Sequence, residues 1–529
     1  MKKRKLFAIL LVLALVLSLA ACNKKADPGT TSPANPSAPT NSASPSSPAS
    51  PAAPGKKVEI TAALGTIANG LDPVSEDTNL TMSVCYHIYD KLFELDPATY
   101  DRIPGVAKAW NEIDAMTWTF EIDLNIKFQN GDPLTMDDVV YSFTRLLDIP
   151  KSADTGKQVS LSYEGNVLTM KASAMNAAII PRAVAMAPIV NKAYIEAGGN
   201  DAVYLKPIGT GPYKVTEFTP GTSLTIETWD GYIYKKPQID IIHFVLIPEA
   251  ANRLIAVESG QIQYGALVTK MEFAVAEKNP NLGTINGVSN RVATFGFNNE
   301  KEPFNKINVR RGIIHALDRD SFVALQGGRP PIKGVLFPGF TKYYSDPPGL
   351  PEYNMAKAKQ LLEAEGISPA NPLDVVLLYF PQNADPGLEM FKASLQNLGV
   401  NLILDQVEFS VYLSREGPGD FDMFFTAFPN RGCHPLTDLD RYDPAFLGMR
   451  NVVRYHNDEY LELANKVRAS TNLDEQLRLI AKINEILGYE VPQVAVFLTP
   501  ILCVMDKNLT GVTVRADLIQ SFRNATYTG

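Results

Sequence analysis

The chain lacks the sequence motifs of several common enzyme classes. It contains no Gly-x-Ser-x-Gly elbow, no Gly-x-x-x-x-Gly-Lys-Ser/Thr loop and no His-Glu-x-x-His pair. Its carboxylates are scattered and form no obvious acid/base pair. The chain is acidic and has no basic stripe, which argues against nucleic-acid binding. We therefore expect a protein that is not an enzyme and that needs no cofactor.

Cysteine is also scarce, with four residues at positions 22, 85, 433 and 503. This number excludes a small scaffold built from disulfides. If Cys22 is modified, as argued below, three cysteines remain, which is an odd number for an exported protein. The three cysteines could form one disulfide and leave one free thiol. Alternatively, all three could be reduced.

Long apolar runs are absent after the first 22 residues. No later segment approaches 18 consecutive apolar residues, so no other membrane-spanning helix is expected. Residues 2–5 are basic, and the apolar run from Leu6 to Leu19 is too short to cross a bilayer, which indicates a targeting segment. The run ends at Leu19-Ala20-Ala21-Cys22, which resembles a bacterial lipobox. The alternative is an ordinary secretory signal followed by an unrelated cysteine.

The lipobox resemblance implies a diacylglyceryl group on Cys22 and a mature chain that is anchored to the membrane rather than spanning it. We therefore predict a lipoprotein signal peptide at residues 1–22. The mature protein would lie on the outer face of the plasma membrane or in the periplasm.

Residues 23–56 predict a disordered tether, because eight prolines among residues 26–55 alternate with small polar residues and offer little apolar area. The body that follows, residues 57–529, is too long for one ordinary core and suggests at least two lobes. The formal charge of −8 includes the four positive charges of residues 2–5, so the rest of the chain carries about −12.

The body alternates between strand and helix patterns. Thr117–Leu124 alternates as a strand, Asn130-Gly131 is typical of a hairpin turn, and Thr135 caps a predicted helix. We expect helical structure from Met82 to Phe93, further helices at 303–323 and 353–366, and strands within 58–73 and at 371–380. Residues 473–497 predict a late helix followed by an apolar strand. The 303–323 helix buries Ile313, Ile314 and Leu317.

An ordered series of short motifs runs through nearly the whole body. The series contains Tyr89-Asp90-Lys91-Leu92, Pro104 to Trp110, Phe128 to Val139, Pro207 to Tyr213 and the segment FNNEKEPFNKINVRRGIIHALDRD. It resembles extracellular solute-binding protein family 5, the peptide/nickel type that includes dipeptide- and oligopeptide-binding lipoproteins of ABC importers. The resemblance implies an α/β, two-lobed periplasmic-binding-protein-like (venus flytrap) fold with an enlarged, discontinuous first lobe.

By this resemblance, the first lobe consists of residues 57–80, 207–290 and 497–529. Residues 81–206 form an extra subdomain of that lobe, and residues 291–496 form the second lobe. The implied function is a substrate-binding component that delivers a peptide or similar small solute to an ABC permease and ATPase. A metal chelate is among the open ligands. Contact with the membrane is through the lipid only, and no nucleic acid is involved.

The segment FDMFFTAFPNRGC at residues 421–433 carries the predicted second-lobe part of the ligand site. Phe428 stands where many relatives have tryptophan, which implies an aromatic wall. Arg431 stands where peptide-binding relatives usually have an acid that pairs with the ligand's amino terminus. An arginine there favours a carboxylate or phosphate. Alternatively, Phe428 is a core residue and Arg431 is a surface or interlobe residue of a shifted loop.

Two Cys/His pairs add to the predicted site. Cys85 and His87 flank Tyr86 in a segment that faces the cleft in relatives, and Cys433 adjoins His434. Thiolate and imidazole suit zinc, nickel or copper, although no standard zinc spacing is present. Buried or solvent-facing structural roles, or a Cys85–Cys433 disulfide, are the alternatives. The candidate ligand-binding residues are Arg431, Phe428, Tyr86, His87, Cys433 and His434, and no protein metal site is predicted.

Two other function classes stay open at this point. The same fold serves a signalling receptor or surface adhesin that takes no part in transport. An exported hydrolase would need an activity that falls when one carboxylate or Cys433 is removed. Genes for a permease and ATPase beside this gene would separate the transport role from the receptor or adhesin role.

Overall fold

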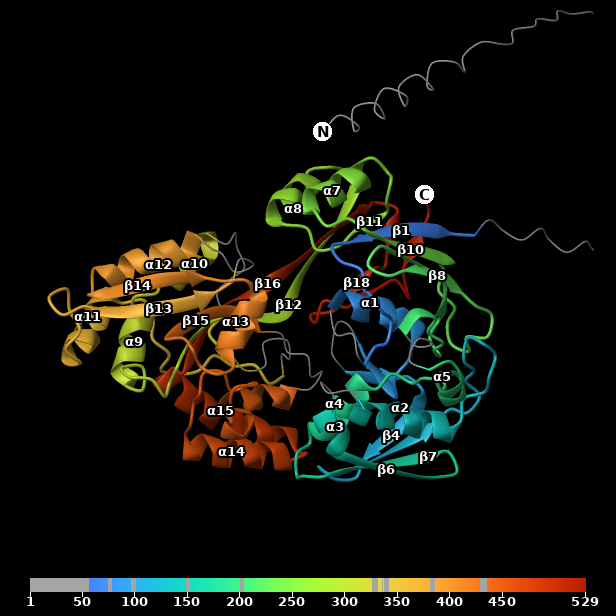
Figure 1. Ribbon diagram of the computed structural model, residues 1–529, viewed down its shortest axis with the longest axis horizontal. Helices are drawn as coiled ribbons and strands as arrows, with labels where there is room; N and C mark the ends of the chain where they lie inside the picture. Colours follow the sequence, from blue (N-terminus) through green and yellow to red (C-terminus); the bar gives the residue numbers. More distant parts are fainter. Residues whose placement is uncertain are drawn as a thin grey trace, which may run out of the picture. The chain divides into compact units, whose positions relative to one another are not determined.

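The computed structural model describes residues 57–74, 79–96, 101–148, 153–199, 204–325, 332–334, 336, 342–380, 386–428 and 435–529. Its largest element is a ten-stranded mixed sheet (Figure 1). From one edge to the other, the strands are β14 (Val400–Gln406), β13 (Leu373–Tyr379), β15 (Met423–Phe428), β12 (Leu282–Phe297), β16 (Gln493–Asp506), β11 (Tyr264–Gly265), β1 (Glu59–Leu64), β10 (Ile241–Leu246), β9 (Ser223–Thr228) and β8 (Tyr213–Thr219).

Two long antiparallel strands at the centre of this sheet connect two separate cores. β12 has 16 residues and β16 has 14. At one end β16 pairs with β11, and at the other end β12 pairs with β15. The register between β12 and β16 shifts between Val288 and Val292. The sheet is therefore shared by two lobes, and the long strands pass from one lobe to the other (Figure 1).

The first lobe packs helix α1 (Asn79–Ile88) against one face of β1, β8, β9 and β10. Phe522 and Ala525, near the C-terminus, are buried in the same core. Helices α7 (Ala250–Glu258) and α8 (Lys270–Ala276) form a second, smaller core with β1 and β16. Thr269 and Glu272 form a capping box that begins α8.

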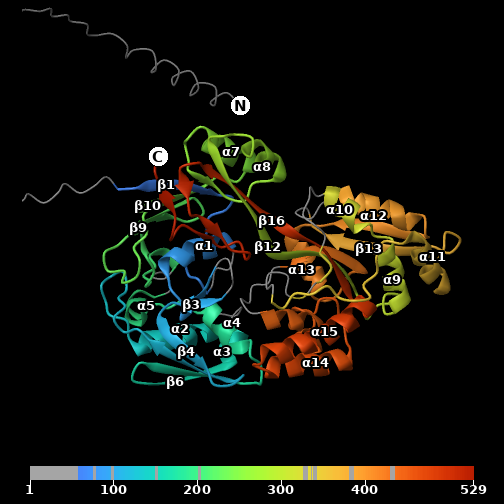
Figure 2. The same cartoon turned by 180° about the vertical axis from the view of Figure 1, so that it is seen from behind.

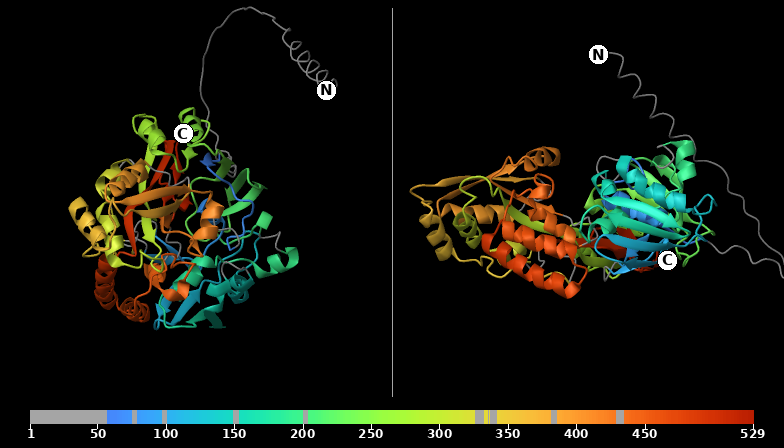
Figure 3. Two further views of the ribbon diagram at one scale, coloured as in Figure 1. Left: turned by 60° about the vertical axis from the view of Figure 1, so that its left-hand side comes forward. Right: turned by 90° about the horizontal axis from the view of Figure 1, so that it is seen from below.

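A four-stranded antiparallel sheet forms the core of the predicted subdomain (Figure 3). Its order is β4 (Ala107–Glu112), β5 (Thr117–Ile122), β7 (Val167–Ala172) and β6 (Val159–Glu164). The remaining elements here are β2 (Phe93–Leu95), β3 (Arg102–Pro104), α2 (Met136–Asp148), α3 (Ala153–Lys157), α4 (Ile179–Met186) and α5 (Lys192–Gly198). As predicted, Thr135 caps α2, because its Oγ1 accepts the backbone N–H of Asp138 at 3.2 Å.

The second lobe is layered, with helices on both faces of β13 and β15. Side chains alternate along a strand, so Leu377 enters one core while its neighbour Leu378 enters the other. The first core contains side chains of α9 (Ile307–His315), α10 (Arg319–Leu325), α11 (Met355–Ala364) and α12 (Pro386–Gln396), which surround the β13–β14 end of the sheet (Figure 2). The second core contains side chains of α13 (Phe409–Glu416), α14 (Asp458–Ala469), α15 (Leu473–Glu490) and the 3-10 helix η2 (Pro435–Tyr442).

The predicted continuous helix at 303–323 is wrong, because the structure has two helices there. α9 ends at His315 and α10 begins at Arg319. Asp318 accounts for the break, since its carboxylate accepts the Ser321 backbone N–H at 3.1 Å and the Ser321 hydroxyl at 2.6 Å. Ile313, Ile314 and Leu317 are nevertheless buried, as expected.

Two of the predicted lobe boundaries fall within strands rather than in the loops between elements. Of the predicted boundaries, 207 lies before β8, whereas 290 and 497 lie inside β12 and β16. Val84, Cys85, Ile88 and Tyr89 pack in the first-lobe core, although the boundary predicted at 80/81 assigns them to the subdomain. Among the described residues, no helix combines the length and apolar character needed to cross a membrane.

Candidate ligand-binding site

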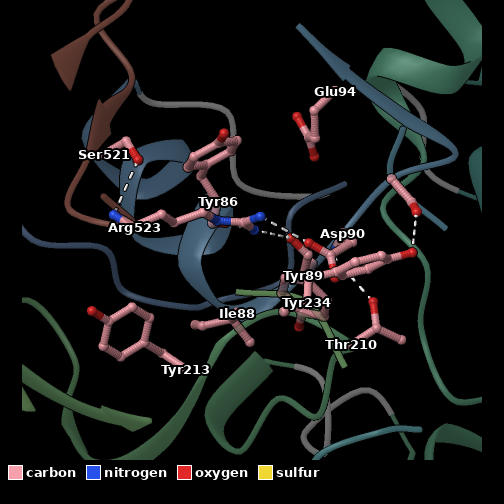
Figure 4. Close-up of polar contacts among 12 residues, drawn as sticks. Tyr86, Ile88, Tyr89, Asp90, Glu94, Thr210, Tyr213, Tyr234, Ser521 and Arg523 are labelled. Atoms are coloured by element: carbon pink, nitrogen blue, oxygen red, sulfur yellow. Dashed lines mark hydrogen bonds and ion pairs between the residues drawn. The ribbon is translucent and has the colours of Figure 1, made fainter. Parts of the chain in front are cut away.

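The segment predicted to face the cleft is held by the C-terminal end of the chain. α1 carries Tyr86 and His87, and β19 (Gln520–Ser521) lies beside it. The backbone N–H of Gln520 donates to Ser83 Oγ at 3.0 Å. Residues more than 430 positions apart therefore meet in the first lobe, and Figure 4 shows Tyr86 of α1 beside Arg523 of the C-terminal segment.

His87 is fully buried, and both of its ring nitrogens are engaged within the fold. Nδ1–H donates to the Ser83 carbonyl at 2.7 Å, and Nε2 accepts the backbone N–H of Phe522 at 3.0 Å. Because the carbonyl can only accept and the amide can only donate, the ring is the neutral Nδ1–H tautomer. Burial, and next the charge of Arg523, lower the pKa of His87 from 6.5 to about 3. His87 thus joins α1 to the C-terminal segment and has no ring nitrogen left for a ligand.

Tyr86 lies between two arginines of the C-terminal segment. The guanidinium carbon of Arg523 is 4.3 Å from the centre of its ring, and that of Arg515 is 5.9 Å away. Both distances are within cation–π range. Burial is the main cause that raises the pKa of Tyr86, while the charge of Arg523 lowers it in part. Tyr86 is therefore a neutral ring with two cations beside it at neutral pH.

Three acidic residues lie beside these arginines. Arg523 Nη1 donates to Asp90 Oδ1 at 2.9 Å, and Arg515 forms a two-point ion pair with Asp517, whose shorter contact is 2.6 Å. Glu94 Oε2 is 3.9 Å from Arg515 Nη1, which is too far for a hydrogen bond. Burial alone would lower the pKa of Arg523, but Asp90 and other neighbouring groups raise it above its ordinary value.

A small pocket opens between α1 and the C-terminal segment. Its volume is about 10 Å³, room for a group of roughly the size of a water molecule. The pocket is lined by Met82, Cys85, Tyr86, Tyr89, Lys91, Glu94, Pro188 and Ile519. Two neighbouring carboxylate oxygens, Glu94 Oε1 and Asp90 Oδ2, are buried without a hydrogen-bond partner in the described part of the chain.

Most of the predicted second-lobe site lies outside the described residues. This applies to Arg431, Cys433 and His434, and also to Cys22. Phe428 is the last residue of β15, and its backbone pairs with Val292 of β12, but its side chain is not described. β15 therefore ends beside Val292 of β12, next to the register shift between β12 and β16.

The Cys/His pairs show no metal geometry in the part of the chain that the structure covers. Cys85 and Cys503 are buried and are not joined in a disulfide, and Cys85 Sγ lies 3.6 Å from the Leu71 carbonyl oxygen. Within the described ranges, no group of three or more His, Cys, Asp or Glu residues could hold a metal ion.

The subdomain and the second lobe touch directly. The backbone N–H of Ala177 donates to the Arg468 carbonyl at 2.8 Å. Ala177 and Ala178 share a buried cluster with Leu436 and Leu439 of η2. Nearby, Arg468 bonds Asp440 at 3.0 Å and Asp443 at 2.6 Å.

Sequence reasoning identified Tyr86 but not the charged residues around it. Asp90 and Glu94 follow Tyr86 at intervals of four, yet α1 ends at Ile88, so helical spacing did not connect all three. Arg515 and Arg523 lie in short strands and turns near the C-terminus and have no local signal. Only the tertiary fold brings these charges together.

Comparison with known proteins gives one consistent family. A family model described as "Bacterial extracellular solute-binding proteins, family 5 Middle" matches residues 101–444. The dipeptide-binding protein of Escherichia coli is 25% identical over 370 residues, which cover 63% of this chain and 68% of that protein. The oligopeptide-binding protein OppA of Bacillus subtilis is 26% identical over 461 residues, which cover 78% and 82%.

A solved structure also resembles this chain. The structure of HbpA2 from Haemophilus parasuis matches with a TM-score of 0.78 at 21% identity and covers 89% of this chain and 100% of that chain. This likeness confirms the predicted two-lobed, periplasmic-binding-protein-like α/β fold. At this level of identity it informs on the fold alone.

Proposed function

Because this chain belongs to the family 5 bacterial extracellular solute-binding proteins, we propose that it is the lipid-anchored, extracytoplasmic substrate-binding component of an ABC importer. The observation that carries the proposal is the family match over residues 101–444, on a chain whose two lobes are joined by β12 and β16. The membrane anchor would be a lipid on Cys22, and the partners would be an ABC permease and its ATPase. The relatives compared above are binding proteins rather than enzymes.

Capture of the solute would proceed by closure of the two lobes. A ligand that contacts both lobes stabilises the closed state relative to the open one by its differential binding energy. The register shift between Val288 and Val292 supports this mechanism, because a strand bends more easily where its ladder is interrupted. The Ala177–Arg468 hydrogen bond supplies a contact that closure could make and opening could break.

The ligand would be a peptide or a similar small solute, as the printed names of the E. coli and B. subtilis relatives suggest. Arg431 favours a ligand with an exposed carboxylate, and Phe428 and Tyr86 would supply aromatic contacts. Cys433 and His434 would add soft donors if the ligand is a metal chelate. His87 would act through the position of Tyr86, because its nitrogens already bond the backbone.

Native mass spectrometry of the purified protein, followed by calorimetry with the ligand that it identifies, tests this function. Arg431→Ala should weaken binding of a carboxylate ligand by about 1.5–3 kcal/mol, the range for a hydrogen bond to a charged group. Lys466→Ala, an exposed change on α14, is the control and should leave affinity unchanged. Wild-type affinity in the Arg431→Ala protein would show that Arg431 does not bind the ligand.

Two cellular measurements test the anchor and the transport role separately. Cys22→Ser should release the protein from the membrane fraction, and retention would refute the lipid anchor. Deletion of the gene should abolish uptake of the identified solute. Normal uptake with an intact ligand-binding protein would instead support a signalling receptor or adhesin on the same fold.

A further inference from the structure

The subdomain and the second lobe are in contact although the long strands that join the lobes run elsewhere. In Figures 1 and 2 the side of the subdomain that carries α3 and α4 faces α14 and α15. We propose that residues 176–182 of the subdomain are a latch, which binds η2 and the end of α14 and holds the lobes together without a ligand. The proposal deepens the proposed function and rests on it, because such a latch raises ligand affinity from outside the ligand site.

The subdomain is fixed to the first lobe, so its contacts with the second lobe act between the lobes. Arg145 of α2 forms a buried two-point ion pair with Asp72 of the first lobe, at 2.8 and 3.3 Å. Gln129 Nε2 donates to the carbonyl oxygens of Ile88, at 2.8 Å, and of Tyr213, at 2.6 Å. The subdomain therefore moves with the first lobe when the lobes open.

The apolar part of the latch is made of small side chains. Ala115, Ala177 and Ala178 of the subdomain belong to a buried cluster whose other described members come from residues 292–495. Leu436 and Leu439 of η2 are among them. Alanine loses no side-chain rotamer entropy on burial, so this contact can form and separate at little entropic cost. A contact of this kind suits a movement that is repeated in every transport cycle.

The polar part of the latch joins two groups that are already held in place. Asn176 Oδ1 accepts the backbone N–H of Ala178 at 3.0 Å, which fixes the turn that presents Ala177. The Ala177 N–H donates to the Arg468 carbonyl at 2.8 Å. The buried Arg468 side chain is itself held by ion pairs to two aspartates of the second lobe. Little order is therefore lost when the hydrogen bond forms.

Charge also acts across the contact. Burial raises the pKa of Asp440 in η2, whereas the positive charges of Arg450, Arg468 and Arg182 lower it in part. Arg450 and Arg468 belong to the second lobe, but Arg182 lies in α4 of the subdomain. The subdomain thus contributes a cation that attracts a carboxylate of η2.

A second contact lies between Lys342 of the second lobe and Asp101 of the subdomain. Lys342 Nζ is 3.2 Å from Asp101 Oδ1. The neighbouring Tyr343 hydroxyl donates to Gln476 Oε1 at 3.0 Å and so attaches this segment to α15. Both charged side chains are exposed, so the pair orients the lobes more than it stabilises them.

The latch is a weaker connection than the one between the subdomain and the first lobe. Its described contacts are a neutral backbone hydrogen bond, small apolar side chains and exposed or partly compensated charges, whereas Arg145 and Asp72 form a buried ion pair that is costly to break. Opening at the register shift between Val288 and Val292 therefore separates the latch and leaves the subdomain on the first lobe. The latch increases the closed population of the unliganded protein, and apparent affinity rises with that population.

The first experiment tests the latch without any ligand. Hydrogen–deuterium exchange of the unliganded full-length protein in detergent is followed by mass spectrometry. Ala177→Arg places a long charged side chain in the buried cluster and should increase exchange in residues 436–442 and 466–469. Ala251→Arg, the same change at an exposed position of α7, is the matched control and should keep wild-type exchange. Equal exchange in the wild type and in Ala177→Arg would overturn the proposal.

A charge exchange keeps the test decisive if Ala177→Arg does not fold. Lys342→Glu opposes Asp101 with a like charge on the exposed surface and should also increase exchange in residues 436–442 at low ionic strength, where repulsion is least screened. Adding Asp101→Lys restores opposite charges and should return exchange to the wild-type level. Equal exchange in the single and the double variant would overturn the proposal.

The second experiment depends on the proposed function and uses trialanine as the probe. Calorimetry should show trialanine binding about fivefold or more weaker in Ala177→Arg, since a neutral hydrogen bond and part of the closed population are lost. Ala251→Arg should bind like the wild type. Unchanged affinity in Ala177→Arg would overturn the link between the latch and capture. If the wild-type protein does not bind trialanine, the peptide role fails, while the exchange experiment still decides the latch.

Discussion

Arg523 and Asp90 lie 433 residues apart in the sequence and form an ion pair of 2.9 Å between Nη1 and Oδ1. The same guanidinium donates to the backbone carbonyls of Tyr86 and Tyr89. These contacts attach the end of the chain to the loop after α1. Tyr86 is therefore held in position by Arg523, which lies six residues before the last residue of the chain.

Arg523→Met should destabilise the protein strongly. The Arg523 side chain is 14% exposed and that of Asp90 is 3% exposed, so the substitution leaves a buried carboxylate without its cation. We expect a loss of about 3 kcal/mol in the free energy of unfolding, measured by urea denaturation. Lys466→Met breaks an exposed i,i+4 pair with Glu462 and is the matched control, with no measurable change expected. Equal stabilities for the two variants would contradict the role of the buried pair.

Acid should destabilise the first lobe through His87. Its folded pKa is about 3 and its ordinary value is 6.5, so below pH 6.5 the unfolded chain takes up a proton that the fold excludes. The stability contribution is complete above pH 6.5 and decreases towards pH 3, by roughly 2 kcal/mol between pH 6.5 and 5.

Replacement of the imidazole tests this pH dependence. His87→Gln should lower stability at pH 7.5, because it perturbs the bonds to Ser83 and Phe522, but it should flatten the loss between pH 7.5 and 5. Lys466→Met, at an exposed lysine of α14, is the control and should keep the wild-type slope. A wild-type slope in His87→Gln would show that other groups cause the acid sensitivity.

Glu416 should have the opposite pH dependence. Burial raises its pKa from 4.5 to about 6, although the Tyr412 hydroxyl at 2.6 Å and the charge of Arg441 lower it in part. The folded state therefore favours the protonated acid, and this contribution is present below pH 4.5 and is lost as the pH rises through 6. Glu416→Gln should stabilise the protein by about 1–2 kcal/mol at pH 7.5 and by little at pH 4.5. Equal changes in the free energy of unfolding at the two pH values, measured by urea denaturation, would contradict the raised pKa of Glu416.

Gly488→Ala should destabilise the protein, although alanine is the better helix former. Gly488 lies in α15, and a Cβ atom there would be 2.1 Å from the Pro348 carbonyl oxygen. The gain of about 1 kcal/mol from helix propensity is outweighed by displacement of this backbone, so we expect a net loss of about 1–3 kcal/mol. Lys482→Ala, on the exposed face of the same helix, is the control and should change stability little. Increased thermal stability of Gly488→Ala would show that the Pro348 loop moves freely.

Local sequence patterns predicted the helices whose ends are set by capping residues close to them in the chain. α2 begins after Thr135, and α11 follows its cap Asn354 and is closed by Gly366, which adopts a φ of +80°. The break between α9 and α10 was missed because the apolar spacing continues through Leu317 while Asp318 caps a new helix. The surroundings of Tyr86 could be predicted only in part, because Tyr86 lies beside a family motif but its partners Arg515 and Arg523 come from the far end of the chain.

The path of β12 and β16 also determines the order in which the lobes can form during export. One core of the second lobe is built only from residues between Ala293 and Phe497, a continuous stretch of chain. The first-lobe core needs residues from Ile60 through Ala525. If the amino end is translocated first, all residues of this second-lobe core are therefore exported before the last residues of the first-lobe core. The second lobe can then fold before the first lobe is complete. A chain that stops short of Arg523 would carry a finished second lobe beside an open first one.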